Sequence, residues 1–510
     1  MKHNGWRQES WKRCAGALCI LSALTFAPAL PALTMPVQAA MVQTQTGMQV
    51  QSMAWDPAVK TGLNDLVRLY GSSAPSYRQD ARPYAIFDFD NTTSIMDVEE
   101  QLEIWQLDHL AFAIAPSQMS TILKTGIPAD KLDATYGADD GSGRQVSIRD
   151  AIFDASRAYA SLYKAGLITP NGRTLTAAEQ ARPDYQEFKA KMRWLYDAIG
   201  ETMDASVSYP WVTYWFTGMT PQQVYNLALT CDAYYGNPEK GQTWDKGHYM
   251  SPADSLSLAG PVRVSFKRGI TVTPEMKEVY RTLSQNGIDC WIDSASPVDV
   301  VRAAVDYFQI PGVKGIVAMT NKTDAQGRYI NAYDYDLHAQ TQGEGKAQTI
   351  DKVIAPQYGG RGPIFVAMDS QGDFNFCTEY KDTKEVLIIN RKRSDDAGLC
   401  AAIAVWQKGK GLTLAEVNRQ GDALFLLQGR DENSGVFWST DETRLLGKSQ
   451  PAYLSDKALA AVDQLNQGKS VGQVLADNTK LKTSYAGYKS RSRKKEFMEA
   501  LTNYWGEVVK

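Results

Sequence analysis

The chain has 510 residues, of which 44% are hydrophobic and 22% are charged. These proportions are typical of globular proteins and exclude fibrous and disordered chains, while the length suits two or three domains. The formal net charge of −3 disfavours a general nucleic-acid-binding protein.

The first forty residues have the pattern of a secretory signal peptide. Four basic residues precede a mostly apolar, uncharged stretch from Cys14 to Leu33, and the small residue Ala39 offers a cleavage site. A membrane anchor is the alternative, but prolines interrupt the apolar stretch and no basic stop-transfer segment follows it. We therefore predict that residues 1–39 are cleaved, which gives a secreted or periplasmic protein with no stable membrane span.

The four cysteines that remain after cleavage are an even number in an oxidising compartment. They are Cys231, Cys290, Cys377 and Cys400. We predict a disulfide between Cys377 and Cys400, because both flank one predicted strand, whereas Cys290 lies in an apolar strand and needs no partner. Cleavage also removes four basic residues and Glu9, which leaves 50 basic and 56 acidic side chains and a net charge of −6.

Residues 40–82 read as a polar N-terminal extension, and a sheet pattern begins after it. Short apolar runs bounded by loop residues are typical of buried parallel strands. These runs are Tyr84–Phe87, Ile288–Ile292, Val313–Met319, Ile364–Met368 and Val386–Ile389. Helix-start signals at Thr273-Pro274 and Ser296-Pro297 lie between the runs. The alternation predicts a doubly wound, Rossmann-like α/β core with a parallel sheet.

A long insertion separates the first strand from the second, far beyond an ordinary crossover connection. We predict that residues 83–104 and 263–392 form the core and that 105–262 form a large, mainly helical cap inserted after the first strand. Tyrosines alternating with polar residues between Lys322 and Leu337 indicate a hairpin or flap. Residues 393–510 are predicted to form a helix-rich extension, within which Leu426–Asp431 has a structured pattern with no assignable role.

Polar residues follow the first strand in the order Asp88-Phe89-Asp90-Asn91-Thr92. Alternation along an extended chain directs both aspartates to one side, where they repel each other unless a cation or a shared proton offsets the charge. This pattern alone is weak, because acidic residues also occupy ordinary turns and helix caps.

Further groups at later strand ends complete a chemical set. Asp293-Ser294-Ala295-Ser296 follows the second strand, Gly343-Glu344-Gly345-Lys346 begins a helix, and Asp369 to Asp373 follows the fourth strand. Parallel strands present these groups at one edge of the sheet. Together they supply a nucleophile, an acid/base, a hydroxyl, a cation and metal-seeking carboxylates, as metal-assisted phosphoryl transfer requires.

The four groups, in this order, resemble the four motifs of the haloacid dehalogenase superfamily. The resemblance is closest to the phosphoserine-phosphatase-like branch, and the long cap and export signal are most similar to secreted phosphorylcholine phosphatases. It implies a phosphomonoester hydrolase in which Asp88 is the nucleophile and Asp90 the general acid/base. The implied cofactor is Mg²⁺, held by Asp88, the backbone carbonyl of Asp90, Asp369 and Asp373.

The same resemblance and chemistry assign phosphate binding to Thr92, Ser294 and Lys346. Three alternatives remain open: Lys346 as a solvated surface lysine, Ser294 as a helix cap, with Ser296 fitting that role equally, and Asp373 as a purely structural residue.

The cap is expected to select a small-molecule phosphomonoester. Glu100, with Glu99 as the second choice, is placed shortly after the first motif, where an acid can face a cationic substrate group; the alternative is a helix N-terminus with ordinary acids. An aromatic cluster from Tyr209 to Trp244 suits a quaternary ammonium group, although most of these rings are expected in the cap's own core.

These features predict a phosphorylated amino alcohol, such as phosphorylcholine or phosphoethanolamine, as substrate. A broad-specificity acid phosphatase and a relative of phosphoserine phosphatase are the alternatives within enzymes. A binding protein on a catalytically retired scaffold is the alternative outside them.

Overall fold

The computed structural model describes residues 48–236, 244–253 and 257–491, and these all lie in one compact unit, Thr46–Lys510. The predicted signal peptide, residues 1–39, lies outside the described residues. Among the described residues, no helix combines the length and the hydropathy that crossing a membrane requires.

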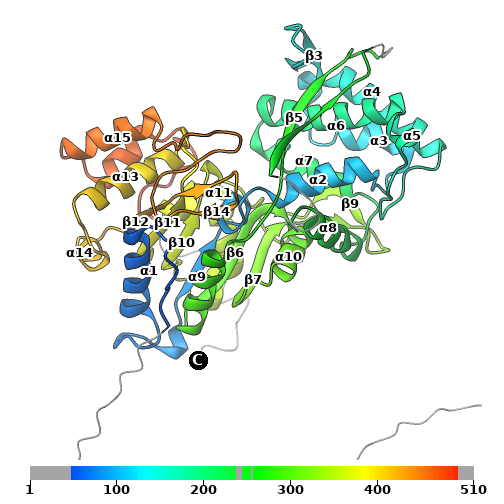
Figure 1. Cartoon of the computed structure of the whole chain (residues 1–510). Coiled ribbons are helices and arrows are strands. Elements are labelled where there is room, and N and C mark those ends of the chain that lie inside the picture. The colour runs from blue at the N-terminus through cyan, green and yellow to red at the C-terminus, as the bar shows by residue number, and fades with distance from the viewer. Residues whose placement is uncertain (1–47, 237–243, 254–256, 492–510) are drawn as a thin grey trace, which may run out of the picture. The chain divides into compact units, whose positions relative to one another are not determined.

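A six-stranded, fully parallel sheet forms the centre of this unit (Figure 1). Its strand order is β12-β11-β10-β1-β6-β7, so the first strand lies between β10 and β6. The strands are β1 (Tyr84–Phe87), β6 (Asp289–Pro297), β7 (Val313–Met319), β10 (Phe365–Met368), β11 (Glu385–Ile389) and β12 (Leu424–Gln428). The strand order changes direction beside β1, which confirms the predicted doubly wound α/β fold.

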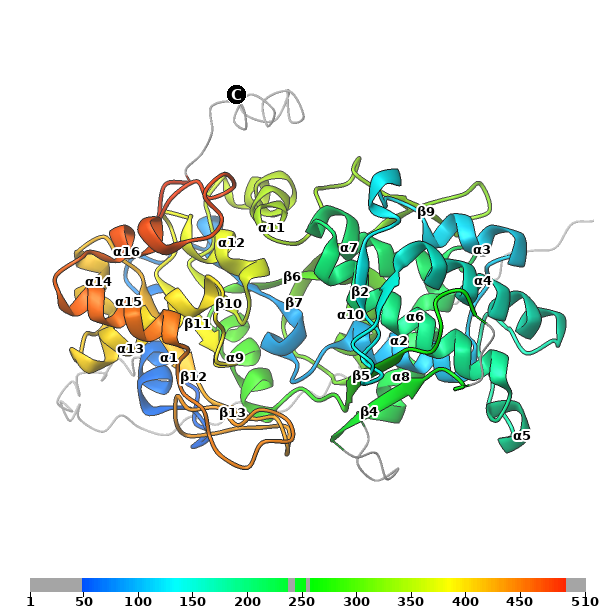
Figure 2. The same ribbon diagram turned by 90° about the horizontal axis from the view of Figure 1, so that it is seen from above.

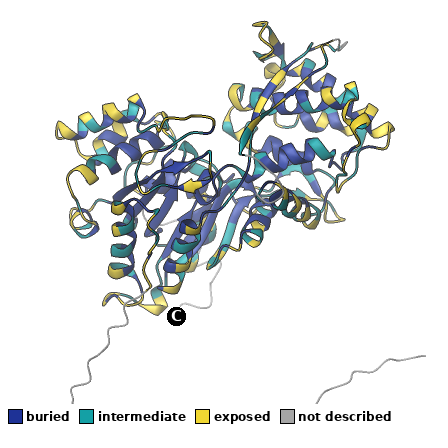
Figure 3. Ribbon diagram, viewed as in Figure 1, coloured by how far each residue is buried: buried dark blue, intermediate teal, exposed yellow. Residues whose placement is uncertain are grey.

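Both faces of the sheet are covered, which explains why its strands are continuous apolar runs. Ala85 and Phe87 pack in one hydrophobic cluster, whereas Tyr84 and Ile86 pack in a second cluster on the opposite face. The first face is covered by α1 (Pro57–Tyr70), α9 (Pro274–Gln285), α10 (Val298–Tyr307) and α14 (Leu414–Arg419). The second is covered by α11 (Glu344–Thr349), α12 (Phe374–Thr378), α13 (Ala397–Gly409), α15 (Asp456–Asn466) and α16 (Val471–Asn478). Figure 3 shows the buried sheet between these layers.

Most of the chain between β1 and β6, up to β5, forms a second, mainly helical group of elements (Figures 1 and 2). Its helices are α2 (Val98–His109), α3 (Pro116–Leu123), α4 (Ile148–Lys164), α5 (Ala177–Gln180), α6 (Pro183–Thr202), α7 (Ala205–Thr213) and α8 (Pro221–Tyr235). Two antiparallel pairs accompany them, β2 (Thr135–Gly137) with β3 (Gln145–Ser147) and β4 (Asp245–Met250) with β5 (Arg263–Arg268). We refer to this group as the cap.

The predicted hairpin forms between β8 (Asn321–Thr323) and β9 (Tyr329–Tyr333), which pair in antiparallel fashion. Its second strand contacts the cap, because the Tyr329 N–H donates to the carbonyl of Met219 at 2.8 Å. The hairpin therefore links the core to the cap.

The C-terminal segment contributes more to the core than its predicted helix-rich character indicates. Besides α13 to α16 it contains β12, which pairs with β11 and completes the sheet. A short antiparallel pair, β13 (Arg430–Asp431) and β14 (Val436–Phe437), follows. β12 was not predicted from the sequence, because it lies among helical segments and joins the sheet through tertiary pairing with β11.

The predicted disulfide between Cys377 and Cys400 is corrected by the structure, in which both are free, buried thiols. The prediction relied on their positions around β11, but Cys377 lies within α12 and Cys400 within α13, where both pack in the apolar layer on the second face. Burial raises the pKa of each thiol, so both stay protonated at neutral pH.

Candidate active site

Two neighbouring strands bring the first acidic groups together at the carboxyl edge of the sheet. β1 pairs with β10, with Phe87 opposite Ala367, and Asp88 and Asp369 follow these strands directly. The Asp88 N–H donates to the Ala367 carbonyl at 3.1 Å and extends the ladder by one bond. This edge is where open α/β sheets bind their ligands.

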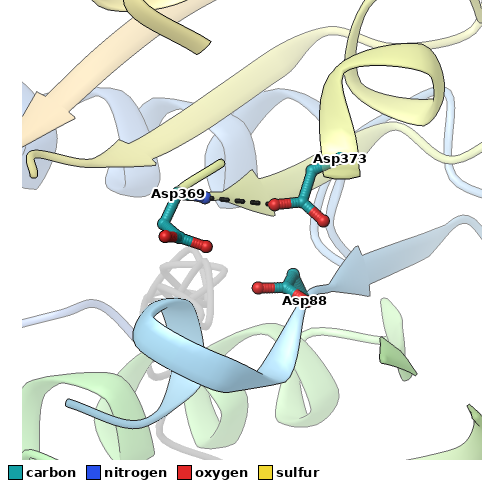
Figure 4. Close-up of side chains that lie close together, drawn as sticks. All are labelled: Asp88, Asp369 and Asp373. Atoms are coloured by element: carbon teal, nitrogen blue, oxygen red, sulfur yellow. Dashed lines mark hydrogen bonds between the residues drawn. The ribbon is translucent and has the colours of Figure 1, made fainter. Parts of the chain in front are cut away.

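Three carboxylates converge at that edge (Figure 4). Oxygen atoms of Asp88, Asp369 and Asp373 lie within 4.8 Å of one another, and all three residues are buried. Burial and the charge of Asp373 raise the pKa of Asp88, and burial likewise raises that of Asp373. Such a cluster repels itself unless a cation is present, and carboxylate oxygens are the ligands that Mg²⁺ prefers. The three side chains therefore fit the predicted ion, and the contribution predicted for Asp90 is its backbone carbonyl.

Lys346 places a positive charge against two of the three carboxylates, Asp88 and Asp373. It is 1% exposed, and its Nζ lies 2.6 Å from Asp88 Oδ1 and 2.7 Å from Asp373 Oδ1. Gly345 allows this placement, because a Cβ there would lie 1.9 Å from the carbonyl oxygen of Gln340. The structure thus places Lys346 inside the site and not in the solvent.

Asp90 turns its carboxylate away from the cluster and toward β6. Its Oδ1 accepts the Val98 N–H at 2.7 Å, and its Oδ2 accepts the Ser296 hydroxyl at 2.6 Å. Burial raises the pKa of Asp90 to about 7, aided by the charge of Asp88 and opposed by the Ser296 hydrogen bond. A carboxyl group with this pKa can give and take a proton near neutral pH.

Thr92 orients carboxylates, which is a different task from the predicted phosphate contact. Its hydroxyl donates to Asp88 Oδ2 at 2.7 Å and lies 3.3 Å from Asp369 Oδ1. Thr93 binds the backbone of Asp88, since its hydroxyl donates to the Asp88 carbonyl at 2.7 Å. The two threonines thereby fix the side chain and the backbone of Asp88.

Of the two serines after the second strand, Ser296 and not Ser294 lines the cavity over the site. Ser294 is fully buried, and its hydroxyl accepts the Ser296 N–H at 3.1 Å. β6 continues to Pro297, beyond the predicted strand end at Ile292. Ser294 still pairs in register with Ala318, whereas the register shifts between Ser294 and Pro297, so Ser296 lies in the irregular end of the strand. The phosphate contact predicted for Ser294 is better suited to Ser296.

A cavity of about 580 Å³ lies over the carboxylate cluster. The core lines it with Asp88, Asp90, Ser296, Lys346, Asp369, Asp373, Arg391 and Arg393. Cap residues complete the lining, among them Tyr136, Tyr196, Asp197, Glu201 and Tyr209. The cavity is thus lined by charged side chains from the core and by acidic and aromatic side chains from the cap.

Glu99 lines this cavity, whereas Glu100, the first choice from sequence, lies in an ion pair with Arg193 at 3.5 Å. Glu99 Oε2 accepts the Ser296 hydroxyl at 3.3 Å, and its Oε1 is buried without a hydrogen-bond partner among the described residues. Burial and the nearby charge of Asp97 raise the pKa of Glu99. The helical rotation between adjacent residues directs the two glutamates to different neighbours.

Only one member of the predicted aromatic cluster lines the cavity in the described residues, and that is Tyr209. Trp211 and Trp215 are 1% exposed and pack in the cap core, as expected for most of these rings. Tyr136 on β2 and Tyr196 on α6 reach the cavity instead, and the sequence analysis missed both because they lie far from any motif.

Arg391 is a further site residue that the sequence analysis missed. It follows β11, and its Nη1 lies 2.5 Å from Asp369 Oδ2. A basic residue just beyond a predicted strand end was the available signal, because all strands of this sheet deliver their following residues to one edge.

No protein-family model and no curated protein matches this chain. A solved structure described as a conserved, functionally unknown protein from Anaerococcus prevotii DSM 20548 is 27% identical, with a TM-score of 0.66; the match covers 78% of this chain and 100% of that chain. The match covers more than three quarters of this chain, and that protein is described as functionally unknown.

Weaker similarities include two phosphatase-related structures. A phosphoserine phosphohydrolase-like protein from Francisella tularensis subsp. tularensis SCHU S4 is 13% identical over 60% of this chain and 87% of that chain, with a TM-score of 0.25. An aspartyl-phosphate intermediate analogue of phosphoserine phosphatase is 10% identical over 60% of this chain and 86% of that chain, also with a TM-score of 0.25. At these TM-scores neither similarity bears on activity.

Proposed function

We propose that this chain is a phosphomonoester hydrolase that acts through an aspartyl-phosphate on Asp88, in the manner of the haloacid dehalogenase superfamily. One observation carries the proposal. The Asp88 carboxylate belongs to a buried three-carboxylate cluster and lies 2.6 Å from Lys346, while Asp90, two residues on, has a pKa of about 7. A nucleophile, a cation and a proton carrier therefore share one edge of the sheet.

Asp88, Asp369 and Asp373 would hold the divalent cation, which we propose is Mg²⁺. When bound, it supplies positive charge that reduces the repulsion between a carboxylate nucleophile and a phosphate dianion. Lys346 contributes further positive charge, since its Nζ contacts both Asp88 and Asp373. Arg391 orients Asp369 through its 2.5 Å contact.

In the first half-reaction an Asp88 oxygen forms a bond to phosphorus while the phosphorus–oxygen bond to the leaving group breaks. The hydroxyl of Thr92 holds Asp88 Oδ2, so the nucleophile enters the reaction in a defined orientation. Protonated Asp90 gives its proton to the departing alkoxide, which leaves as an alcohol.

In the second half-reaction a water oxygen attacks the phosphorus of the acyl phosphate. Asp90, now ionised, accepts the proton of that water, and the bond between phosphorus and the Asp88 oxygen breaks. Inorganic phosphate leaves, and both aspartates return to their starting protonation states. The hydrogen bonds from Val98 and Ser296 keep Asp90 in place through both steps.

We further propose that the substrate is a small phosphorylated amino alcohol such as phosphorylcholine or phosphoethanolamine. Support comes from the cap residues that line the cavity. Burial raises the pKa of Asp197 only to about 6, so it supplies negative charge at neutral pH, and Tyr136 and Tyr196 supply aromatic rings. Glu99 lines the same cavity, and a cationic substrate group would lower its raised pKa and favour the carboxylate. Carboxylates and aromatic faces both attract a cationic ammonium group. The predicted signal peptide supports a secreted or periplasmic location for the proposed enzyme.

Phosphate release from a panel of phosphomonoesters tests the proposal. The panel contains phosphorylcholine, phosphoethanolamine, phosphoserine, glycerol phosphate and an aryl phosphate, each assayed with Mg²⁺ and with EDTA. We expect metal-dependent release and a preference for the two cationic alcohols over glycerol phosphate. Equal rates across the panel would contradict the substrate class, and no release from any member would contradict the phosphatase.

A further inference from the structure

Arg430 contacts the turn after the nucleophile from a distant part of the chain. It is 0% exposed and lies just beyond β12, in the segment for which the sequence indicated no role. Its Nη1 donates to the carbonyl oxygen of Asn91 at 2.7 Å, and its Nη2 donates to Asn91 Oδ1 at 3.0 Å. We refer to residues 88–96, which contain this turn, as the nucleophile loop.

Asn91 adopts a backbone conformation that non-glycine residues rarely use. Its φ is +61° and its ψ is −1°, in the left-handed region that asparagine tolerates better than most residues. This turn lets the Thr92 hydroxyl reach Asp88 while Asp90 accepts the Val98 N–H. Because Arg430 binds both the carbonyl and the side chain of Asn91, it opposes rotation out of that conformation.

Glu432 pairs with Nη2 of Arg430, the same nitrogen that donates to Asn91 Oδ1, and is buried with the arginine. Its Oε1 lies 2.6 Å from Arg430 Nη2, and its Oε2 accepts the Leu446 N–H at 3.0 Å. Although burial opposes ionisation, Arg430 and Lys267 lower the pKa of Glu432 to about 2. The glutamate is therefore an anion at every working pH.

The same carboxylate connects to the cation site. Glu432 Oε1 lies 3.9 Å from Arg391 Nε, and Arg391 Nη1 lies 2.5 Å from Asp369 Oδ2. A continuous series of charged contacts thus runs from Asn91 through Arg430, Glu432 and Arg391 to Asp369. It joins the nucleophile loop to a carboxylate on the neighbouring strand end.

We propose that Arg430 and Glu432 are positioning residues: Arg430 orders the nucleophile loop, and Glu432, through Arg391, sets Asp369 against it. The segment from Leu424 to Glu432 is then part of the active site and not an appendage to it. The catalytic consequence rests on the proposed phosphatase function, whereas the ordering of the loop does not.

Two substitutions separate the guanidinium geometry from its charge. Arg430→Lys keeps a positive charge for Glu432 but cannot make both bonds to Asn91, and Arg430→Met removes charge and bonds together. Arg444→Gln is the matched control, because Arg444 pairs with Asp431 at 3.1 Å in the same segment and contacts neither Asn91 nor Asp369 in the described structure.

Hydrogen exchange of the full chain without added metal, followed by mass spectrometry, reads the loop directly. We expect faster exchange of the amides of residues 89–98 in both Arg430 variants, with exchange of the central strands unchanged, and wild-type exchange throughout in Arg444→Gln. In phosphate release, we expect kcat to fall about 10- to 100-fold in Arg430→Lys while KM changes little. If Arg430→Met does not fold, Arg430→Lys and the near-isosteric Glu432→Gln decide the question.

Wild-type exchange of residues 89–98 in a folded Arg430→Lys variant would overturn the ordering role. Faster loop exchange with wild-type kcat would overturn the catalytic consequence. A wild-type chain that releases no phosphate would instead refute the proposed function, and the exchange result would still decide whether Arg430 orders the loop.

Discussion

Lys346→Met tests how strongly one buried ammonium group holds the carboxylate cluster together. Lys346 is 1% exposed and bridges Asp88 and Asp373 at 2.6 and 2.7 Å. Removing one partner from a buried ion pair costs about 3–5 kcal/mol, because it leaves uncompensated charge in the interior. Methionine has a similar length and apolar stem, so the change removes charge with little loss of packing. We expect a decrease in the free energy of unfolding of about that size in metal-free buffer.

The size of this decrease should depend on pH in a defined direction. Without the lysine, the pKa values of Asp88 and Asp373, already raised by burial, rise further in the folded protein. An acid with a higher pKa in the folded protein than in the unfolded chain ionises more readily in the unfolded chain. The free energy of unfolding therefore decreases as pH increases. The deficit of the variant should therefore be larger near pH 8 than near pH 5, and added Mg²⁺ should reduce it.

Urea unfolding of wild type, Lys346→Met and Lys408→Met measures these differences. Lys408 is the matched control, because it also bridges two aspartates, Asp56 at 2.9 Å and Asp441 at 2.8 Å, but is 41% exposed. Solvent screening limits its expected cost to about 1 kcal/mol. Equal costs for the two substitutions, or a Lys346→Met deficit that does not change with pH, would refute the reasoning. Lys346→Met should also lower kcat by about 10²- to 10³-fold.

Three further predictions concern acid/base chemistry, substrate selection and stability. Because Asp90, with a pKa of about 7, must be protonated to release an alkoxide, kcat/KM for alkyl phosphates should fall as pH rises through about 7. In Asp90→Asn the decrease of kcat/KM with pH should disappear, and the rate should fall about 10²- to 10⁴-fold. An unchanged pH profile would contradict the role of Asp90 as general acid. Glu99→Gln should raise KM for phosphorylcholine several-fold but not for glycerol phosphate, whereas Glu100→Gln should affect neither; KM measurements that show the reverse would restore Glu100 as the contact. Burial raises the pKa of Asp232 to about 8, so its carboxyl stays protonated in the folded protein while it ionises in the unfolded chain, and stability should fall as pH rises from about 4 to about 8. Urea unfolding of Asp232→Asn across this range should give a slope shallower by up to about 1.36 kcal/mol per pH unit, and identical slopes would show that Asp232 is not buried as a neutral acid.

The sheet was predictable from sequence because its strands are buried on both faces. Tyr84–Phe87 and Val386–Ile389 are apolar at every position apart from the tyrosine hydroxyl, and no amphipathic helix produces such a run. β12 has the same character, but it lies among helical segments and precedes no motif residue, so its membership of the sheet depended on tertiary pairing with β11.

The site residues at strand ends were also predictable, because parallel strands deliver them to one edge. What the sequence could not indicate is the direction of individual side chains. Ser296 replaces Ser294 in the cavity because Ser294 still pairs regularly within β6, whereas the strand register shifts after it. Glu99 replaces Glu100 because one step along a helix turns a side chain by about 100°. The role of Arg430 could not be predicted from the sequence, because its partner Asn91 is 339 positions away in the chain.

The predicted disulfide was wrong for the same reason: sequence position does not give the direction of a side chain. Proximity to one strand in sequence says little about which side chains can meet, and Cys377 and Cys400 instead lie as free thiols within two helices that cover the sheet.

The central claim is that Asp88 carries the phosphoryl group during turnover. Acid quenching of the wild-type chain during hydrolysis of phosphorylcholine with Mg²⁺, followed by peptide mass spectrometry, tests it most directly. We predict a phosphoryl adduct on the peptide that contains Asp88, and neither adduct nor turnover in Asp88→Asn, with the fold retained. Full turnover in Asp88→Asn, or an adduct on a different residue, would contradict the account.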